Sequence, residues 1–195
     1  MHNNALQERP ADRSATRTLP RAALPVLFAV YLAFLAWTVL WKLQTPYVGA
    51  AAGVWRPFKL VPFVAFGEFG ASDPTELLVN VALFVPFGVY LAVLAPKRPW
   101  WWSVVVCGAF SLALELLQHL LSVGSFDVTD VITNTAGGLI GWAAMQAAHR
   151  RSGYDVTPRT AFLLCLALTV LWVVALVIAM AFGPNLVPQH DIVVR

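Results

Sequence analysis

The sequence predicts an all-α membrane protein, a polytopic transmembrane helical bundle of about five spans with an aromatic interfacial segment between the first two. Hydrophobic residues make up 59% of its 195 residues and charged residues only 12%. This is more apolar surface than one soluble core of that size could bury. The apolar residues form runs close to the roughly 20 residues that a helix needs to cross the hydrocarbon of a bilayer.

Five apolar runs meet or nearly meet that length. They are Ala22–Trp41, Glu76–Ala95, Trp100–Leu121, Asp127–Ala148 and Thr160–Phe182. Asn80 and Pro86 interrupt the second run, and Asp130 and Asn134 interrupt the fourth. A cleaved signal peptide is a weaker interpretation of the first run, because this run is longer than a typical signal core and follows a long arm that contains acidic residues.

These runs divide the chain into three regions. Residues 1–21 are a basic arm with prolines and mixed charges, a composition that predicts disorder. Residues 22–148 are the predicted membrane domain, and residues 149–195 hold a connection, the fifth span and a short tail. No internal repeat relates the spans to one another.

The basic residues lie in alternate connections between the spans. They are Arg9, Arg13, Arg17 and Arg21 before the first span, Lys97 and Arg98 after the second, and Arg150, Arg151 and Arg159 after the fourth. Under the positive-inside rule, this pattern predicts a cytoplasmic N-terminus and an outer C-terminus in the cytoplasmic membrane. The formal net charge of +3 therefore indicates orientation, and no nucleic-acid partner is predicted.

Small and polar residues share one face of the third span. Gly108, Ser111, Glu115 and Gln118 recur at intervals of three and four, the spacing of neighbours on a helix. Glu115 lies about two turns inside the span, where an ionised side chain must be paired, hydrated or neutralised. It is therefore the first candidate functional residue.

The fourth span carries a similar stripe. Asp127, Asp130, Asn134, Gly137 and Gly141 follow the same spacing, polar at the predicted outer end and small further in. Each also has a structural interpretation. Asp127 suits a helix cap, Asp130 a first-turn acid and Asn134 an interhelical hydrogen bond, while Gly137 and Gly141 allow close helix packing.

Asn80 of the second span lies at a similar predicted depth, about one turn from the outer end. Because carboxylates facing lipid are costly, we expect the polar stripes to face one another around an acidic pocket in the outer leaflet. The predicted ligand-binding residues are Asn80, Glu115, Gln118, Asp127, Asp130 and Asn134.

No metal or cofactor is predicted. Glu115, His119 and the two aspartates are a weak metal alternative, since a single histidine without further closely spaced ligands is a poor zinc signature. Cys107 and Cys165 lie in the middle of separate apolar runs, where a thiol behaves as a small hydrophobe. They do not indicate a disulfide framework.

The connection between the first two spans interleaves aromatic and basic residues. In residues 54–70 these are Trp55, Phe58, Phe63, Phe66 and Phe69 with Arg56 and Lys59. Aromatic residues are typical of the membrane interface, and prolines exclude one continuous helix. The segment is predicted to anchor at the interface or to act as a lid, with Arg56 or Lys59 as the cation partner of the acids.

Four motifs in order resemble the VanZ-like family of bacterial membrane proteins. They are "VPF" at 61–63, "NVALFVPFG" at 80–88, "ELLQ" at 115–118 and "SFDVTDVITNTAGGLIG" at 125–141. The resemblance covers about residues 60–142 and carries the six predicted ligand-binding residues. It departs from the family at Gly124, where many members have an arginine just before the fourth span. A cation expected near the carboxylates is therefore absent from its usual position.

The family is named for a glycopeptide-resistance accessory protein, so the resemblance implies a cell-envelope role linked to teicoplanin-type resistance. The leading hypothesis is a non-enzymatic protein that binds a polar or lipid-linked envelope ligand, with membrane lipids, a lipid-linked precursor or a glycopeptide as partners. One alternative is an intramembrane hydrolase or transferase using Glu115, Asp127 and Asp130. The other is an ion-coupled transporter. The sequence does not predict the oligomeric state.

Overall fold

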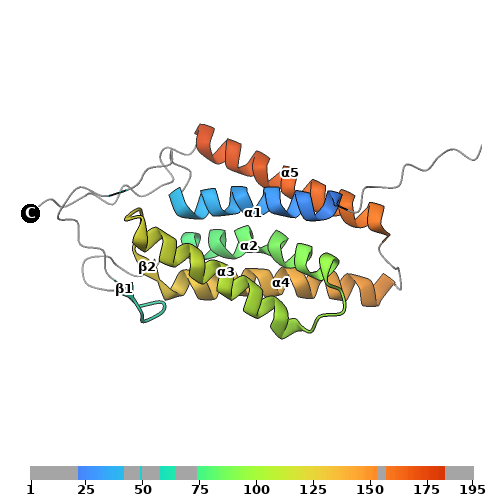
Figure 1. The fold of residues 1–195 in the computed structure, drawn as a ribbon, viewed down its shortest axis with the longest axis horizontal. Helices are drawn as coiled ribbons and strands as arrows, with labels where there is room; N and C mark the ends of the chain where they lie inside the picture. Colours follow the sequence, from blue (N-terminus) through green and yellow to red (C-terminus); the bar gives the residue numbers. More distant parts are fainter. Residues whose placement is uncertain (1–21, 42–48, 50–57, 65–73, 153–156, 183–195) are drawn as a thin grey trace, which may run out of the picture.

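The computed structural model describes residues 22–41, 49, 58–64, 74–152 and 157–182 (Figure 1). The helices are α1 (Ala23–Trp41), α2 (Pro74–Leu94), α3 (Trp100–Leu120), α4 (Val128–Ser152) and α5 (Pro158–Phe182). The strands are β1 (Phe58–Lys59) and β2 (Phe126–Asp127). The described part of the chain is almost entirely helical, which confirms the all-α class. The predicted disordered arm, Arg56 and the tail after residue 182 lie outside the described residues.

The five helices coincide with the five predicted runs, and the differences at their ends have local causes. Helices α2 and α5 each begin at a proline, Pro74 and Pro158, two residues before the predicted start. Proline is favoured at the first helical position because its missing N–H is not needed there. Helix α4 begins at Val128 because Asp127 is its capping residue, and it extends one turn beyond the predicted end at Ala148.

Helix α4 lies against α2 over most of its length and also packs on α3. Helices α1 and α5 pack on each other and on α2, at the side of the bundle away from α4 (Figure 1). The start of α4, the end of α3 and both strands lie at one end of the bundle. We call this end the strand end. The opposite end, where α4 ends and α5 begins, carries Arg150, Arg151 and Arg159, and we call it the basic end.

Glycines allow α2 and α4 to approach backbone to backbone. A Cβ atom added at Gly137 would overlap the carbonyl oxygen of Val81, and one added at Gly141 would overlap that of Val85. On the facing side, a Cβ atom added at Gly88 would overlap a carbonyl oxygen of α4. Small residues permit this kind of close contact between membrane helices, so the contact requires residues without a side chain at these three glycine positions.

A tyrosine of α1 bonds to the backbone of α2 beside an internal proline. Pro86 lacks an N–H and disturbs the helical hydrogen bonds of the preceding turn. In that turn, the Leu83 carbonyl accepts a hydrogen bond from the Tyr31 hydroxyl over 2.6 Å. Tyr31 is fully buried and also stacks on Tyr90, with the ring centroids 5.4 Å apart. These contacts fix α1 against the interrupted part of α2.

Among the described helices, α1, α2, α3 and α5 are long and apolar enough to cross a membrane. Helix α4 is long enough, at 25 residues, but its composition is less apolar. Several of its polar side chains are buried in the bundle, including Thr129, Thr133 and Asn134. The count of five spans and the orientation of the termini stay predictions.

Candidate functional site

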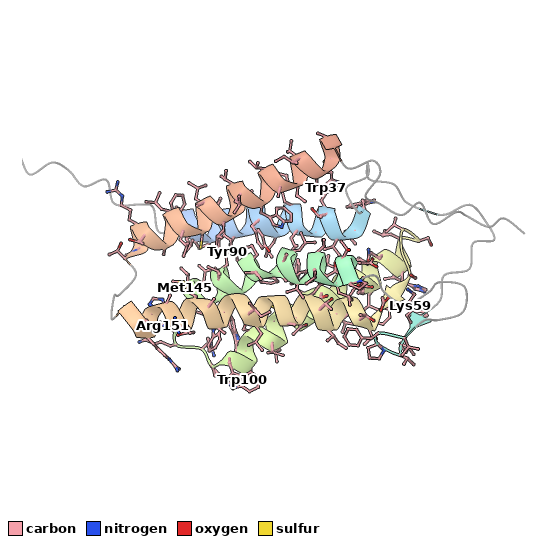
Figure 2. All side chains as sticks on the ribbon, turned by 180° about the vertical axis from the view of Figure 1, so that it is seen from behind. Trp37, Lys59, Tyr90, Trp100, Met145 and Arg151 are labelled. Atoms are coloured by element: carbon pink, nitrogen blue, oxygen red, sulfur yellow. The ribbon has the colours of Figure 1, made fainter. Side chains whose placement is uncertain are left out.

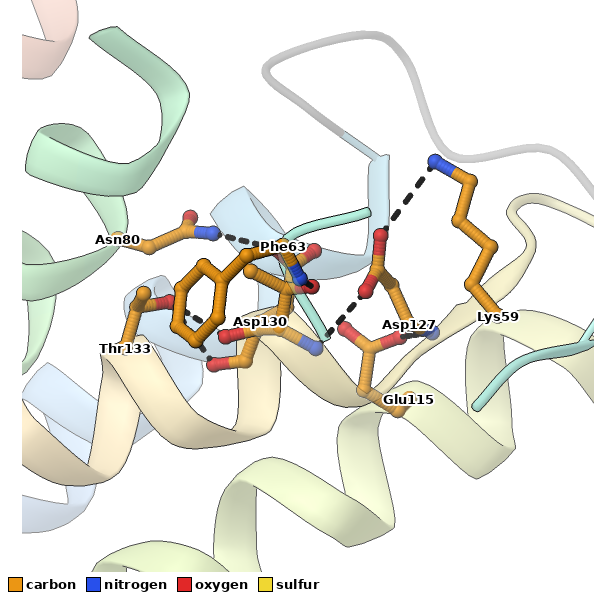
Figure 3. Close-up of polar contacts among 8 residues, drawn as sticks. Lys59, Phe63, Asn80, Glu115, Asp127, Asp130 and Thr133 are labelled. Carbon is orange, nitrogen blue, oxygen red and sulfur yellow. Dashed lines mark hydrogen bonds and ion pairs between the residues drawn. The ribbon is translucent and has the colours of Figure 1, made fainter. Parts of the chain in front are cut away.

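Two short parallel strands bring the first long connection to the start of α4. Phe58 pairs with Phe126 and Lys59 pairs with Asp127. The Lys59 ammonium lies 3.4 Å from Asp127 Oδ2, and these side chains are 16% and 10% exposed (Figure 3). The structure thus brings one of the two predicted cation partners onto a predicted acidic residue, although the sequence had not predicted the strands.

Asp127 joins three elements at this position. Its Oδ1 accepts the N–H of Thr129 over 2.8 Å, which caps the first turn of α4. Its own main-chain N–H donates to Glu115 Oε2 over 2.9 Å, and its second carboxylate oxygen faces Lys59. The capping role and the role as an acidic partner therefore occur in the same residue.

Glu115 projects from α3 beneath this junction and is only 1% exposed (Figure 3). Its hydrogen bond with Asp127 links the interior of α3 to the start of α4. A buried carboxylate must gain hydrogen bonds or paired charges to offset the loss of hydration. Glu115 is therefore part of a connected polar group at the strand end of the bundle.

Asp130, in the first turn of α4, extends this group toward α2. Its Oδ1 accepts a hydrogen bond from Asn80 Nδ2 over 2.7 Å. We call Glu115, Asp127 and Asp130 the carboxylate cluster. Figure 3 shows all three together with Asn80 and Lys59, so the structure brings together four of the six predicted ligand-binding residues.

Asn134 forms a second polar layer deeper in the bundle. Its Nδ2 donates to Ser111 Oγ over 2.9 Å, which links α4 to α3. Asn134 is 1% exposed, and its Oδ1 has no hydrogen-bond partner among the described residues. The predicted interhelical hydrogen bond is therefore present, with one buried acceptor oxygen of Asn134 left over.

Gln118 is turned toward a different neighbour. Its side-chain Nε2 donates to the carbonyl of Val39 in α1 over 2.8 Å, and its main-chain carbonyl accepts the N–H groups of Val123 and Gly124. Gln118 therefore fixes the turn after α3 and the end of α1. Gly124 packs on it, and a Cβ atom added at Gly124 would lie 3.3 Å from the Gln118 Cβ.

Residues 58–64 of the first connection form a short hook. Its main chain is attached to α4 by a hydrogen bond from the Phe63 N–H to Thr129 Oγ1 over 3.1 Å. Its apolar side chains are largely exposed, namely Phe58, Leu60, Val61, Phe63 and Val64. Phe58 also contacts His119, with ring centroids 4.1 Å apart. The hook thus covers one side of the cluster and presents an apolar surface outward.

Thr129 is a contact residue that the sequence analysis did not select. It is 2% exposed, donates its main-chain N–H to Asp127 and accepts the N–H of Phe63 at its hydroxyl. A threonine in the first turn after a capping aspartate carries no signal for a partner so distant in the sequence. Only the strand pairing reveals its role.

The described residues include no group of three or more His, Cys, Asp or Glu side chains arranged to hold a metal ion. Cys107 and Cys165 are buried free thiols on different helices. Among the described residues, one cavity lies at the basic end and another lies beside Phe34 and Trp37 of α1.

Comparison with known proteins identifies the same region. The family described as VanZ/LLP1 matches residues 28–149, which includes the cluster and the hook but not α5. A protein of Enterococcus faecium named Protein VanZ is 37% identical over 115 residues, which cover 59% of this chain and 68% of that protein. No solved structure matches.

The family match covers more than half of the chain, and the relative is matched over more than two thirds of its length. The residues that the family matches contain all four motifs and three of the four long apolar helices in large part or whole. The chain therefore belongs to the VanZ/LLP1 family and is a multi-pass membrane protein.

Proposed function

We propose that this protein binds a polar, lipid-linked ligand of the bacterial envelope at its carboxylate cluster, on the outer side of the cytoplasmic membrane. Through this binding, it contributes to resistance against glycopeptides of the teicoplanin type. The ligand would present a cationic group or hydrogen-bond donors to Asp127 and Asp130. The hook would cover the bound headgroup.

The Lys59–Asp127 ion pair is the observation that carries this proposal. It lies at the edge of the bundle, with both side chains still partly exposed, and directly above the buried contact between Asp127 and Glu115. A cation from a ligand would compete with Lys59 for the same carboxylate oxygen. Displacing the Lys59 ammonium would also remove one of the contacts that hold β1, so binding would be coupled to loosening of the hook.

The charge distribution supports an outer location for the cluster. Lys97, Arg98, Arg150, Arg151 and Arg159 are all exposed at the basic end. Cytoplasmic connections carry an excess of such residues. If the basic end is cytoplasmic, the carboxylate cluster faces the outside, where lipid-linked wall precursors and glycopeptides meet.

The family supports the link to resistance. The relative from Enterococcus faecium carries the name Protein VanZ, and the cluster lies inside the matched region. In this chain Gly124 stands where many members have an arginine, whereas Lys59 supplies a cation to Asp127 from the hook. The proposed site therefore keeps a cation beside its carboxylates, although it comes from a different segment.

The test combines a cell assay with direct binding. A teicoplanin-susceptible bacterial host expressing the protein should need a higher inhibitory concentration of teicoplanin than the host alone, and Glu115→Gln should remove most of that increase. Glu76→Gln is the matched control, because Glu76 is another acid at the same end of the bundle but lies in the first turn of α2. Purified protein should bind a lipid-linked disaccharide peptide, and Glu115→Gln should weaken that binding.

The outcomes separate the alternatives. Equal protection by the wild type and Glu115→Gln, at matched membrane levels, would contradict the proposed site. Turnover of the lipid-linked probe that depends on Glu115 would replace binding with hydrolase or transferase chemistry. Ion flux in reconstituted vesicles that is lost in Glu115→Gln would favour a transporter instead.

A further inference from the structure

A second site lies at the basic end, far from the carboxylate cluster. There α1, α2, α4 and α5 surround a cavity of about 350 Å³. Its wall is mainly apolar and includes Leu24, Val93 and Ala161. The volume is at the lower end of the range found for small-molecule sites. The cavity can therefore hold part of an apolar chain.

Basic residues follow three of the lining residues of this cavity in the sequence. Three further lining residues lie at helix ends or turns, namely Pro96, His149 and Pro158. Pro96 is followed by Lys97 and Arg98, His149 by Arg150 and Arg151, and Pro158 by Arg159. All five cationic residues are exposed. The apolar cavity thus lies at the same end of the bundle as five exposed cationic residues, which we call the basic rim.

No carboxylate lies beside this rim among the residues that the structure describes. The acidic residues of the described segments are Glu76, Glu115, Asp127 and Asp130, and all lie at the strand end. Figure 2 shows Arg151 and Lys59 at opposite ends of the bundle. Asp155, in the connection between α4 and α5, lies outside the described residues, and the described part of the basic end has basic but no acidic side chains.

Aromatic residues set the depth of the rim relative to a membrane. Trp100 and Trp101, at the start of α3, are 57% and 54% exposed. Exposed tryptophans are typical of the headgroup level of a bilayer. The Arg98 guanidinium lies 5.9 Å from the ring centroid of Trp102. The rim is thus expected at the level of lipid phosphates, with the cavity extending toward the hydrocarbon.

We propose that this cavity binds an acidic phospholipid, with an acyl chain in its apolar part and the phosphate among the cations of the rim. The apolar wall and the basic rim match the two parts of such a lipid. A zwitterionic lipid has the same chain but carries a cation that the rim would repel. The site is independent of the carboxylate cluster and would fix α5 to the remaining helices through the lipid.

The test measures lipid retention by native mass spectrometry of detergent-purified protein. Phosphatidylglycerol and phosphatidylcholine with identical acyl chains are offered in equal amounts. We expect about fivefold or greater retention of phosphatidylglycerol, since each basic residue near an anionic membrane surface favours binding by about that factor. The rim variant combines Lys97→Gln, Arg150→Gln, Arg151→Gln and Arg159→Gln and should abolish this preference. Arg98 is kept because of its contact with Trp102.

A charge control and a cavity variant locate the site. Lys59→Gln removes a cation at the strand end and should leave the phosphatidylglycerol preference unchanged. Ala161→Leu places a larger side chain in the cavity and should lower retention, whereas Ala175→Leu adds the same group at an exposed position of α5 and should not. Because the rim residues are exposed, the rim variant should fold. It therefore tests the proposal even if Ala161→Leu does not fold.

Equal retention of the two lipids by the wild type would overturn the proposal, as would an unchanged preference in the rim variant. Normal retention by folded Ala161→Leu would exclude the acyl chain from the cavity and would also overturn it. Inorganic phosphate is tested as a competitor. If millimolar phosphate displaces phosphatidylglycerol completely, the rim is a site for free phosphate and the lipid proposal is wrong.

Discussion

The main-chain N–H of Asp127 donates to the Glu115 carboxylate over 2.9 Å, so the cap of α4 is also a hydrogen-bond donor to the interior of α3. This bond involves the backbone of Asp127, whereas its side chain serves Thr129 and Lys59. Substitutions at the two carboxylates therefore affect different interactions. The predictions that follow separate structural from functional effects on this basis.

Glu115→Gln should retain the fold and lose ligand-dependent function. The glutamine amide oxygen can still accept the Asp127 N–H, whereas Glu115→Ala leaves that buried donor unpaired, at a cost of about 1–3 kcal/mol in unfolding free energy. Detergent unfolding curves should therefore rank the wild type and Glu115→Gln close together and Glu115→Ala lower. A Glu115→Gln protein as unstable as Glu115→Ala would show that the charge itself holds the helices together.

Adding Asp130→Asn to Glu115→Gln should produce little further loss of function, because residues that act in one site are not additive. The measurement is the teicoplanin inhibitory concentration for both single variants and the double variant, at matched membrane levels. Full activity in the double variant would reduce the carboxylates to scaffold residues. Losses that multiply would show that Glu115 and Asp130 act in separate sites.

Asp127→Asn and Asp127→Ala should separate the cap from the ion pair. Asparagine caps helices about as well as aspartate, but it cannot form the ion pair with Lys59. Alanine removes both interactions and should cost about 1 kcal/mol more in unfolding free energy than asparagine. Unfolding of the two purified variants measures the difference. Equal stabilities would mean that the Asp127 side chain contributes nothing as a cap.

Lys59→Gln should loosen the hook without unfolding the bundle. A partly exposed ion pair is worth up to about 1 kcal/mol, so hydrogen exchange at the Phe63 amide should accelerate by up to about fivefold. This amide reports on the hook because it donates to Thr129. Lys97→Gln, at the basic end, is the matched control. Unchanged exchange in Lys59→Gln would show that the main-chain bonds alone hold the hook.

Gly137→Leu and Gly141→Leu should destabilise the bundle, because each added side chain would collide with a carbonyl of α2. Overpacking of a close contact typically costs about 1–3 kcal/mol, and the backbone contact here puts both variants toward the upper value. Ala144→Leu, at an exposed position of α4, is the control for added apolar volume. If thermal stability in detergent is the same for all three variants, the close approach of α2 and α4 contributes little.

Cysteine labelling in intact cells should find Ser125→Cys accessible from outside and Arg151→Cys only after permeabilisation. The native thiols Cys107 and Cys165 are fully buried, which keeps the background low. Labelling of Ser125→Cys only from the cytoplasmic side would reverse the predicted orientation. The carboxylate cluster would then face the inner leaflet, and a role in binding outer envelope ligands would be excluded.

The periodicity of the sequence predicts which face of each helix carries the polar residues. Spacings of three and four indicate the stripe that contains Glu115 and the stripe that contains Asp127 and Asp130, and both stripes are found inside the bundle. Helix ends are also readable where a proline or an aspartate has a strong positional preference, as at Pro74 and Asp127. Local preference is enough in these cases because only the helix itself is involved.

Partners between distant segments could not be predicted in the same way. The strands β1 and β2 have two residues each, too few to show an alternating pattern, so the sequence carries no signal for the pairing of Lys59 with Asp127. A helical stripe also faces more than one neighbour. Gln118 belongs to the Glu115 stripe by spacing, yet its amide nitrogen bonds to Val39 of α1.

Helix α4 packs on both α2 and α3 and is the least apolar of the long helices described. A segment of this composition gains too little from lipid alone to enter the bilayer unaided, because its aspartate and asparagine oppose insertion. We therefore expect α4 to integrate together with α3, the preceding helix, as a hairpin and to complete its insertion by docking its glycines on α2. During biosynthesis, the carboxylate cluster would thus form at the same step in which α4 completes its insertion into the membrane.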